Sequence, residues 1–165
     1  MMPLFETVAD LREGAESLRR RSYGVIEAAD GRFRRVRLRP FPKLVSLPGA
    51  LLLGPWQHRF LPGDRCLLYY NQPRRMRNFL AVTYVVSSRG TGYGTAKRVL
   101  EALDEIARLK RTDAIVCDVG NWRLSRRALA RWGWEPHCPS RWHRHYIKRF
   151  YGQYPPTPAW LCPAG

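Results

Sequence analysis

Apolar residues near the start of the chain recur at the spacing of a helix. This stripe consists of Phe5, Val8, Leu11, Ala15 and Leu18. It ends in the run Arg19-Arg20-Arg21, and cations are favoured in the last turn of a helix. The pattern predicts an amphipathic helix within residues 1–22.

The next part of the chain alternates as strands do. Residues 23–27 and 32–38 flank Asp30-Gly31, and Asp-Gly between two extended segments is a hairpin signal. The second segment is rich in arginine, which predicts one solvated, basic face. Residues 40–62 carry many prolines and glycines and predict short strands with turns, and residues 66–70 predict a further strand.

From residue 78 the pattern predicts a strand, a helix and a second strand. Residues 79–86 are apolar on both faces, which is typical of a central strand. The helical stripe that follows consists of Ala96, Val99, Leu100, Leu103, Ile106 and Ala107. Residues 114–117 predict a buried strand. Short loops on both sides of the helix then imply parallel pairing through a right-handed crossover.

The end of the chain predicts a short helix, a closing strand and a tail. The helix covers about residues 123–132 and ends at Gly133, the residue type best suited to the left-handed position after a helix. Residues 144–151 predict the last strand. The proline-rich residues 153–165 predict an extended tail.

Composition indicates one soluble globular domain. The chain has 165 residues, of which 45% are apolar and 25% charged. We expect a single domain over residues 1–152, with the tail after it. No apolar run is long enough to cross a bilayer, and the first residues lack the features of a secretory signal. A cytoplasmic protein with no membrane partner is therefore expected.

The strong positive charge predicts an anionic partner. There are 29 Lys plus Arg against 13 Asp plus Glu, so the formal net charge is +16. Nucleic acid, a membrane surface and a small phosphorylated ligand would all be attracted, and charge alone does not distinguish them. A general bias toward arginine is the alternative, since the basic residues are spread along the chain.

Cysteine and histidine spacing does not indicate a metal site. Cys66, Cys117, Cys138 and Cys162 show no close pairing, and reduced thiols are expected. The His137-Cys138 pair is followed by His143 and His145. These residues lack the paired spacing that marks zinc sites, so we expect no bound metal.

The turn between the strand at 79–86 and the following helix is the segment best suited to bind a ligand. It reads Arg89-Gly90-Thr91-Gly92-Tyr93-Gly94. Glycines at every second position allow backbone conformations closed to other residues and let amides approach a ligand. The helix start adds free amides and the positive end of its dipole, which favour a phosphate, and Arg89 adds charged donors. Glycines needed only for tight packing are the alternative.

Spacing narrows the choice of ligand. A P-loop requires Gly-Lys-Ser/Thr at the start of the helix, but Gly94-Thr95-Ala96 stands there, so nucleotide triphosphate hydrolysis is not expected. A dinucleotide fold requires its third glycine one residue later than Gly94. Asp118, at the end of the next strand, imitates the ribose-binding acid of that fold, so a dinucleotide-binding protein stays as a lesser alternative.

A third pattern, Arg-x-x-Gly-x-Gly, is met by Arg89, Gly92 and Gly94. It resembles the coenzyme A turn of the GCN5-related N-acetyltransferase (GNAT) superfamily. Members continue with a parallel strand, an Asn, a short helix and a Gly-Phe pair, and Asn121 and Gly133-Trp134 stand at the corresponding places. The similarity covers about residues 78–151.

The resemblance implies a fold, a ligand and a set of binding residues. The fold would be α/β (α+β), with a mixed, mostly antiparallel sheet, a central parallel strand pair and flanking helices. Residues 78–152 would form the coenzyme A-binding half, and residues 23–77 a β-rich half. Acetyl-CoA or another acyl-CoA would be the co-substrate and an amine the acceptor. The implied binding residues are Val85, Val86, Arg89, Gly90, Thr91, Gly92, Tyr93, Gly94, Thr95 and Asn121.

The sequence departs from the family at its catalytic positions. Leu129 stands where many members have a tyrosine that protonates the leaving thiolate, and no glutamate precedes the turn on its strand. An amine nucleophile still needs a base, and Asp118 and Tyr146 are the candidates. Each has a structural alternative, Asp118 as a strand-end or turn-capping residue and Tyr146 as a core aromatic.

Two functions of different classes follow. The first is an acyl-CoA-dependent N-acyltransferase, in which positioning and a backbone oxyanion site supply much of the rate. The second is a GNAT-like binding module that has lost catalysis and contacts RNA or DNA through its basic surface. Residues 141–146, which interleave aromatic and basic side chains, would provide stacking surfaces for the second function. A strand with one buried face is the alternative for that segment.

Overall fold

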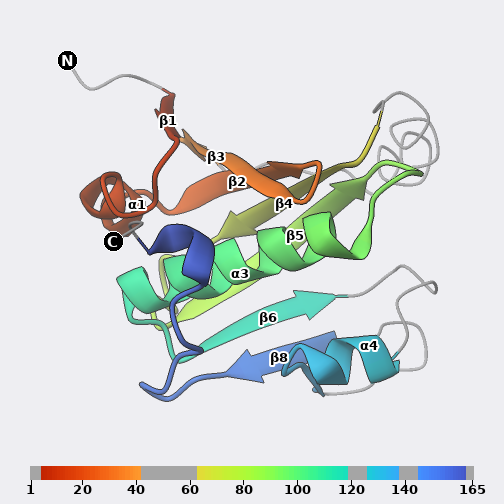
Figure 1. Ribbon diagram of the computed structural model, residues 1–165. Helices are drawn as coiled ribbons and strands as arrows, with labels where there is room; N and C mark the ends of the chain where they lie inside the picture. The colour runs from red at the N-terminus through yellow and green to blue at the C-terminus, as the bar shows by residue number, and fades with distance from the viewer. Residues whose placement is uncertain (1–4, 42–62, 119–125, 138–144, 163–165) are drawn as a thin grey trace.

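The computed structural model describes residues 5–41, 63–118, 126–137 and 145–162. The strands described there form one sheet, in the order β1-β3-β2-β4-β5-β6-β8-β7. They are β1 (Glu6–Val8), β2 (Tyr23–Ala29), β3 (Arg32–Arg39), β4 (Arg65–Asn71), β5 (Phe79–Ser87), β6 (Ala114–Asp118), β7 (Glu135–Pro136) and β8 (His145–Arg149). The helices are α1 (Ala15–Arg20), α3 (Tyr93–Lys110), α4 (Arg126–Arg131) and the short 3-10 helix η1 (Ala159–Leu161). Figure 1 shows α3 lying across the middle of the sheet.

The predicted fold class is confirmed. Neighbouring strands pair antiparallel throughout the described sheet except β5 and β6, which are parallel and lie near its centre. The helix predicted between these two strands is α3. The short strands predicted within residues 40–62 fall almost wholly outside the described residues.

The predicted N-terminal helix is wrong in its first half. Glu6 to Val8 form β1, an edge strand in which Val8 lies opposite Val36 of β3. The chain then turns at Asp10, whose side chain accepts a hydrogen bond from the Arg12 amide at 2.7 Å, and only α1 is helical. The strand, the turn and the short helix bury Val8, Leu11 and Leu18 of the predicted stripe and leave Phe5 exposed. The first residues form a strand because β3 offers a free edge for pairing.

The predicted hairpin is confirmed. β2 and β3 pair around Asp30 and Gly31, which have φ values of 54° and 71°. Two consecutive positive φ values are typical of the type I′ turn that joins right-twisted strands. On β3 the exposed arginines alternate with buried Val36 and Leu38, as the basic-face prediction requires.

Helix α3 and the sheet enclose the main hydrophobic core. Val99, Leu103 and Ile106 of the helix are at most 1% exposed and belong to one cluster with Ile26 and Leu68 of the sheet. The helix also contacts α1. Because α3 packs along most of its length, its first turn is held firmly at the end of β5. No described helix is long and apolar enough to span a membrane.

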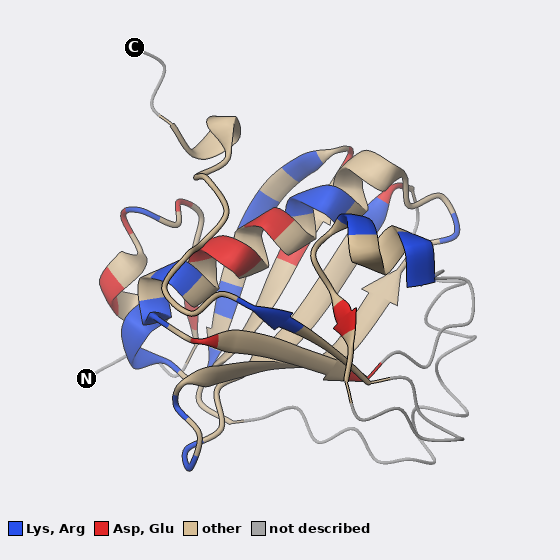
Figure 2. Ribbon diagram, turned by 90° about the horizontal axis from the view of Figure 1, so that it is seen from below, with Lys and Arg blue, Asp and Glu red and all other residues tan. Residues whose placement is uncertain are grey.

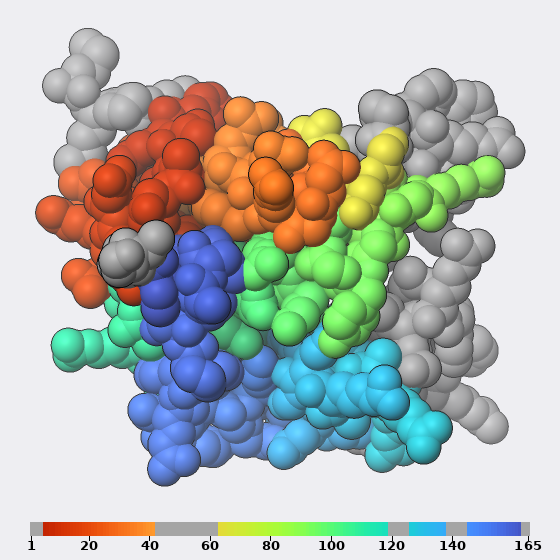
Figure 3. Space-filling model, viewed as in Figure 1, coloured from red at the N-terminus to blue at the C-terminus, as the bar shows by residue number. Residues whose placement is uncertain are grey.

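The proline-rich tail packs on the domain instead of extending away from it. Residues 153–158 form neither helix nor strand, and η1 follows. The Trp160 ring stacks on Phe33 at 5.1 Å, and its Nε1 donates to Glu101 at 2.8 Å. Figure 3 shows the blue atoms of the tail against the orange and green atoms of the hairpin and α3. The tail therefore holds β3 and α3 together.

Candidate functional site

The parallel pair separates halfway along β5. Pairing runs from Phe79 opposite Ala114 to Val82 opposite Cys117, but β5 continues to Ser87. The register with β4 shifts at the same place, so that Thr83 is an extra residue in β5. A bulge bends the strand that contains it. The bulge therefore falls where the described pairing of β5 with β6 ends, and the second half of β5 continues beyond it.

The bulge also changes which side chains of β5 are buried. Val82 packs toward the main core, whereas Val86, 4% exposed, packs with Val25 and Leu67 in a second cluster on the other face of the sheet. Val85 is 45% exposed. Both valines are predicted to line a ligand. The exposed side chain of Val85 could contact that ligand, whereas Val86, whose side chain is buried, could contact it only through its backbone.

The turn after β5 is fixed to the start of β4. Ser88 is buried and donates its amide to the Arg65 carbonyl at 3.0 Å, and its hydroxyl accepts from the Arg65 amide at 3.1 Å. The Thr91 hydroxyl donates to the same Arg65 carbonyl at 2.8 Å. The Thr91 hydroxyl therefore helps to fix the turn to β4.

The prediction that the three glycines adopt backbone conformations closed to other residues is wrong. Gly90, Gly92 and Gly94 all lack the positive φ that only glycine adopts readily, and Gly92 has φ −77° and ψ 162°. Only Gly90 is required by close packing within the protein. A Cβ on Gly90 would lie 3.2 Å from the Gly63 carbonyl oxygen, so a side chain there would push the turn away from β4.

The start of α3 offers free hydrogen-bond donors. Its N-cap, Gly92, makes no side-chain cap, and the first turn contains no acidic residue. Within the described residues the amides of Tyr93, Gly94 and Thr95 have no acceptor, as expected for the first turn of a helix. These donors and the dipole of an 18-residue helix form an anion-binding site. The Thr95 side chain is turned inward and accepts from the Gly31 amide at 2.7 Å.

One carboxylate already lies at this site. The Gly92 amide donates to Asp64 Oδ1 at 2.9 Å, so Asp64 takes the donor next to the three free amides. The sequence did not indicate Asp64, because Asp64 lies before β4, far along the chain from the glycine turn that it contacts. An anionic ligand at the helix start would meet this charge. Arg89 is exposed, has no ion-pair partner among the described residues, and supplies the opposite charge nearby.

An aromatic pair lies at the start of α3. The Tyr93 ring, 66% exposed, stacks on Trp132 at 5.8 Å, and Trp132 Nε1 donates to the Tyr93 hydroxyl at 3.3 Å. The pair joins the start of α3 to the end of α4, whose atoms adjoin in Figure 3. Gly133 follows Trp132 with φ 82°, which confirms the left-handed position predicted after this helix.

The two predicted catalytic residues lie on neighbouring strands but in different environments. Asp118 is the exposed last residue of β6, beyond the point where β5 and β6 separate. Tyr146 of β8 lies opposite Cys117, is 4% exposed and belongs to the main core, which is the position of a packing residue. Asp118 is therefore the better placed of the two to meet a substrate. Asn121, predicted near the end of the ligand, lies outside the described residues.

Other candidate groups do not supply acid or base chemistry. Leu129 is 5% exposed in the main core, so the position of the family tyrosine faces the interior here. Burial, and then the charge of Asp118, raise the pKa of the Cys117 thiol to about 12, which keeps it protonated. Among the described residues no three metal-ligating side chains gather, and Cys138 and His143 are not among those residues.

Glu27 is a buried carboxylate that the sequence analysis did not single out. It is 5% exposed on β2 and accepts from Arg35 at 2.7 Å and from Arg65. Burial raises the pKa of Glu27, but the hydrogen bonds and charges of the two arginines outweigh burial and hold that pKa below its usual value. Glu27 therefore stays ionised as a structural ion pair and is not a proton carrier.

Comparisons with known proteins add one similarity. No protein-family model and no curated protein matches the chain. Among solved structures, that of a nourseothricin acetyltransferase is similar over 89% of this chain and 99% of its own, with a TM-score of 0.42 and 13% sequence identity. Because this TM-score is too low to establish a shared fold, the residues themselves carry the functional hypothesis.

Proposed function

We propose that this protein is an acyl-CoA-dependent N-acyltransferase, which transfers an acetyl or other acyl group from coenzyme A to an amine. One observation carries the proposal. The free amides at the start of α3 follow the stretch of β5 that continues beyond its described pairing with β6. An anion site that follows the end of a parallel strand pair suits a ligand with a pyrophosphate at one end and a linear amide-containing arm.

Each part of the coenzyme has a proposed partner. The pyrophosphate binds the amides of Tyr93, Gly94 and Thr95, with Arg89 adding a charged fork. The pantetheine arm follows β5 past Val85 and Val86, where its amides replace the hydrogen bonds that β6 would make. Asp64 opposes the pyrophosphate and moves away from the Gly92 amide when the ligand binds.

The reaction is an aminolysis of the thioester. The amine nitrogen attacks the acyl carbonyl, a C–N bond forms, and the C–S bond breaks to release the coenzyme thiolate. Asp118 takes the proton that the amine must lose, and the thiolate is protonated from solvent, since Leu129 offers no acid. Holding amine and thioester together near the end of the β5–β6 pairing supplies much of the acceleration.

The dinucleotide alternative has less support. A dinucleotide fold places several parallel strands side by side around its glycine turn. The described sheet has one parallel pair, and its other neighbours are antiparallel. Asp118, the candidate for the ribose-binding acid, is the last residue of β6, and β5 and β6 form that single parallel pair.

Calorimetric titration and a turnover assay test the proposal. Acetyl-CoA should bind saturably and near one to one, and NADH should not bind. Mixtures with small amines and peptides should release free coenzyme thiol, which a thiol reagent detects. No heat and no thermal shift at millimolar acetyl-CoA would overturn the proposal. Binding without turnover of any amine would leave a binding module that has lost catalysis.

Replacing Asp64 with alanine should strengthen coenzyme binding. The substitution removes a negative charge next to the pyrophosphate, and we expect the Kd for acetyl-CoA to fall about fivefold, a change of about 1 kcal/mol. The lost contact with the Gly92 amide should lower the free energy of unfolding by about 1 kcal/mol. Asp10→Ala is the matched control, because Asp10 also accepts from a turn amide but lies before α1. Weaker binding by Asp64→Ala would show that the carboxylate helps to hold the ligand.

A further inference from the structure

Three basic segments meet at the end of α3 opposite the glycine turn. They are residues 19–21, 72–78 and 108–111, and we call them together the basic end. They contain nine cationic side chains and no acidic one. The cations are Arg19, Arg20, Arg21, Arg74, Arg75, Arg77, Arg108, Lys110 and Arg111. Figure 2 shows blue ribbon at the end of α1 and in loops on the same side of the molecule.

Hydrogen bonds join the three segments into one surface. The Lys110 ammonium donates to the carbonyls of Arg19 and Arg21 at 3.2 and 2.7 Å and to Gln72 Oε1 at 3.0 Å. Arg19 Nε donates to the Leu109 carbonyl at 3.1 Å. Three of these four acceptors are backbone carbonyls, and the fourth is the side-chain amide oxygen of Gln72. All four are uncharged, so they neutralise none of the positive charge. The segments are held together although their charges repel one another.

The loop of the basic end has a defined shape. Its first residue, Gln72, donates its amide to the Ser22 carbonyl at 2.7 Å and its side-chain amide to the Arg77 carbonyl at 2.5 Å. The Met76 amide bonds the Pro73 carbonyl at 3.1 Å. The loop therefore presents its arginines from a fixed turn, which lowers the entropy lost when they bind a partner.

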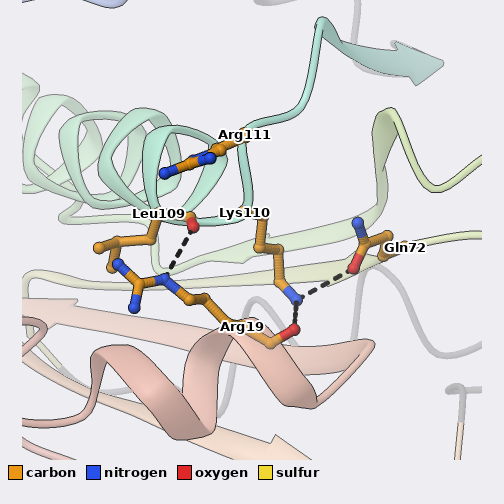
Figure 4. A pocket seen from close by; sticks show the side chains of 5 residues that line it. All are labelled: Arg19, Gln72, Leu109, Lys110 and Arg111. Atoms are coloured by element: carbon orange, nitrogen blue, oxygen red, sulfur yellow. Dashed lines mark hydrogen bonds between the residues drawn. The ribbon is translucent and has the colours of Figure 1, made fainter.

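A shallow hollow of about 380 Å³ lies within the basic end. Figure 4 shows Arg19, Lys110 and Arg111 grouped around it, with Gln72 and Leu109 completing its lining. The hollow is open and strongly basic, so it suits an anionic group better than an apolar ligand.

Most cations of the basic end lack an ion-pair partner. Within the described residues no carboxylate bonds the side chains of Arg19, Arg20, Arg74, Arg75, Arg77 or Arg111. Elsewhere many cations are paired, as Arg35 and Arg65 are with Glu27 and Lys148 is with Asp104. The six exposed arginines without a carboxylate partner in the described part of the chain leave positive charge at the basic end that an external anion can reach.

We propose that the basic end binds the phosphate backbone of double-stranded nucleic acid. Its three segments contain no aromatic residue on which an unpaired base would stack, which favours a duplex over a single strand. Its exposed apolar surface is limited to Met76, which is too little for a membrane-binding face. Two tyrosines border the surface. Tyr151 is exposed beside Asp113, whereas Tyr154 packs its ring on Phe150 and donates its hydroxyl to the Thr112 carbonyl, so Tyr151 is the more accessible of the two for stacking.

This surface is separate from the proposed coenzyme site. The two lie at opposite ends of α3, and 18 residues of helix span about 27 Å. Nucleic acid should therefore bind whether or not acetyl-CoA is present. The inference does not depend on the acyltransferase proposal.

Fluorescence anisotropy of the full chain with labelled 20-base-pair DNA and RNA duplexes tests the inference. The variant is the triple Arg74→Gln, Arg75→Gln, Arg77→Gln, which changes only exposed side chains of the loop. The matched control is the triple Arg32→Gln, Arg34→Gln, Arg37→Gln, which removes the same charge from the exposed face of β3. We expect the loop triple to weaken duplex binding at least about tenfold and to reduce the salt slope by about 3, and the β3 triple to change affinity by less than about threefold.

Equal losses in the two triples would overturn the inference, because they would show that binding follows total charge. Tighter binding of a single strand of the same length would also overturn it, as would binding to vesicles with anionic lipid and not to duplexes. Tyr151→Ala should leave duplex affinity unchanged, whereas a large loss would indicate base stacking. Saturating acetyl-CoA should not displace the duplex.

Discussion

Replacing Gly92 with glutamate should raise the Kd for acetyl-CoA at least about 100-fold, a loss of about 2.7 kcal/mol or more. Gly92 caps α3, and its neighbours provide the three free amides. A glutamate here adds a second carboxylate beside Asp64 where the pyrophosphate is proposed to bind. A Cβ at this position meets only the Asp64 carboxylate, at 3.5 Å or more, so the variant should fold.

The control for this variant is Gln153→Glu, which adds the same charge at an exposed residue after β8. It should change the Kd by less than about twofold, because exposed charges far apart are screened by salt. If both variants lose affinity equally, repulsion at long range would explain the loss. If Gly92→Glu binds as tightly as the unmodified protein, the coenzyme does not bind at the start of α3.

Replacing Leu103 with alanine should lower the free energy of unfolding by about 3 to 4 kcal/mol. Leu103 is fully buried in the main core, on the face of α3 that contacts the sheet. Removing its side chain leaves a cavity that the packed surroundings cannot fill. Urea denaturation should show a lower midpoint with an unchanged slope.

Leu100→Ala is the matched control, since it makes the same chemical change on the same helix at a half-buried position. It should cost about 1 to 2 kcal/mol, because less apolar area leaves water at that position. Equal costs would mean that helix propensity, and not core packing, sets the stability of α3. While folded, both variants should bind acetyl-CoA with the same Kd as the unmodified protein.

Much of the fold could be predicted where local patterns were strong. The Asp30-Gly31 hairpin, the helix α3 and the parallel pair around it all follow from turn chemistry and from apolar spacing. The first strand could not be predicted, because Val8 satisfies a helical stripe and a strand equally well. What decides between them is the free edge of β3, which exists only after the sheet has formed.

The candidate site was only partly predictable. The spacing of Gly90, Gly92 and Gly94 located the turn, but none of the three has an unusual backbone conformation, and only Gly90 is required by close packing. The bulge at Thr83 leaves no sequence signal, yet it falls where the described pairing of β5 with β6 ends. The contact between Asp64 and the Gly92 amide joins residues far apart in the chain, so only the folded structure reveals it.

We propose that the start of α3 and the half of β5 beyond its described pairing with β6 hold an acyl-CoA. Two-dimensional ¹⁵N–¹H NMR spectra recorded during titration with acetyl-CoA test it most directly, because each backbone amide reports separately. The largest saturable shifts should occur at the amides of residues 92–95 and at Val85 and Val86. An absence of saturable shifts, or shifts concentrated at residues 72–78 and 108–111 of the basic end, would contradict the claim.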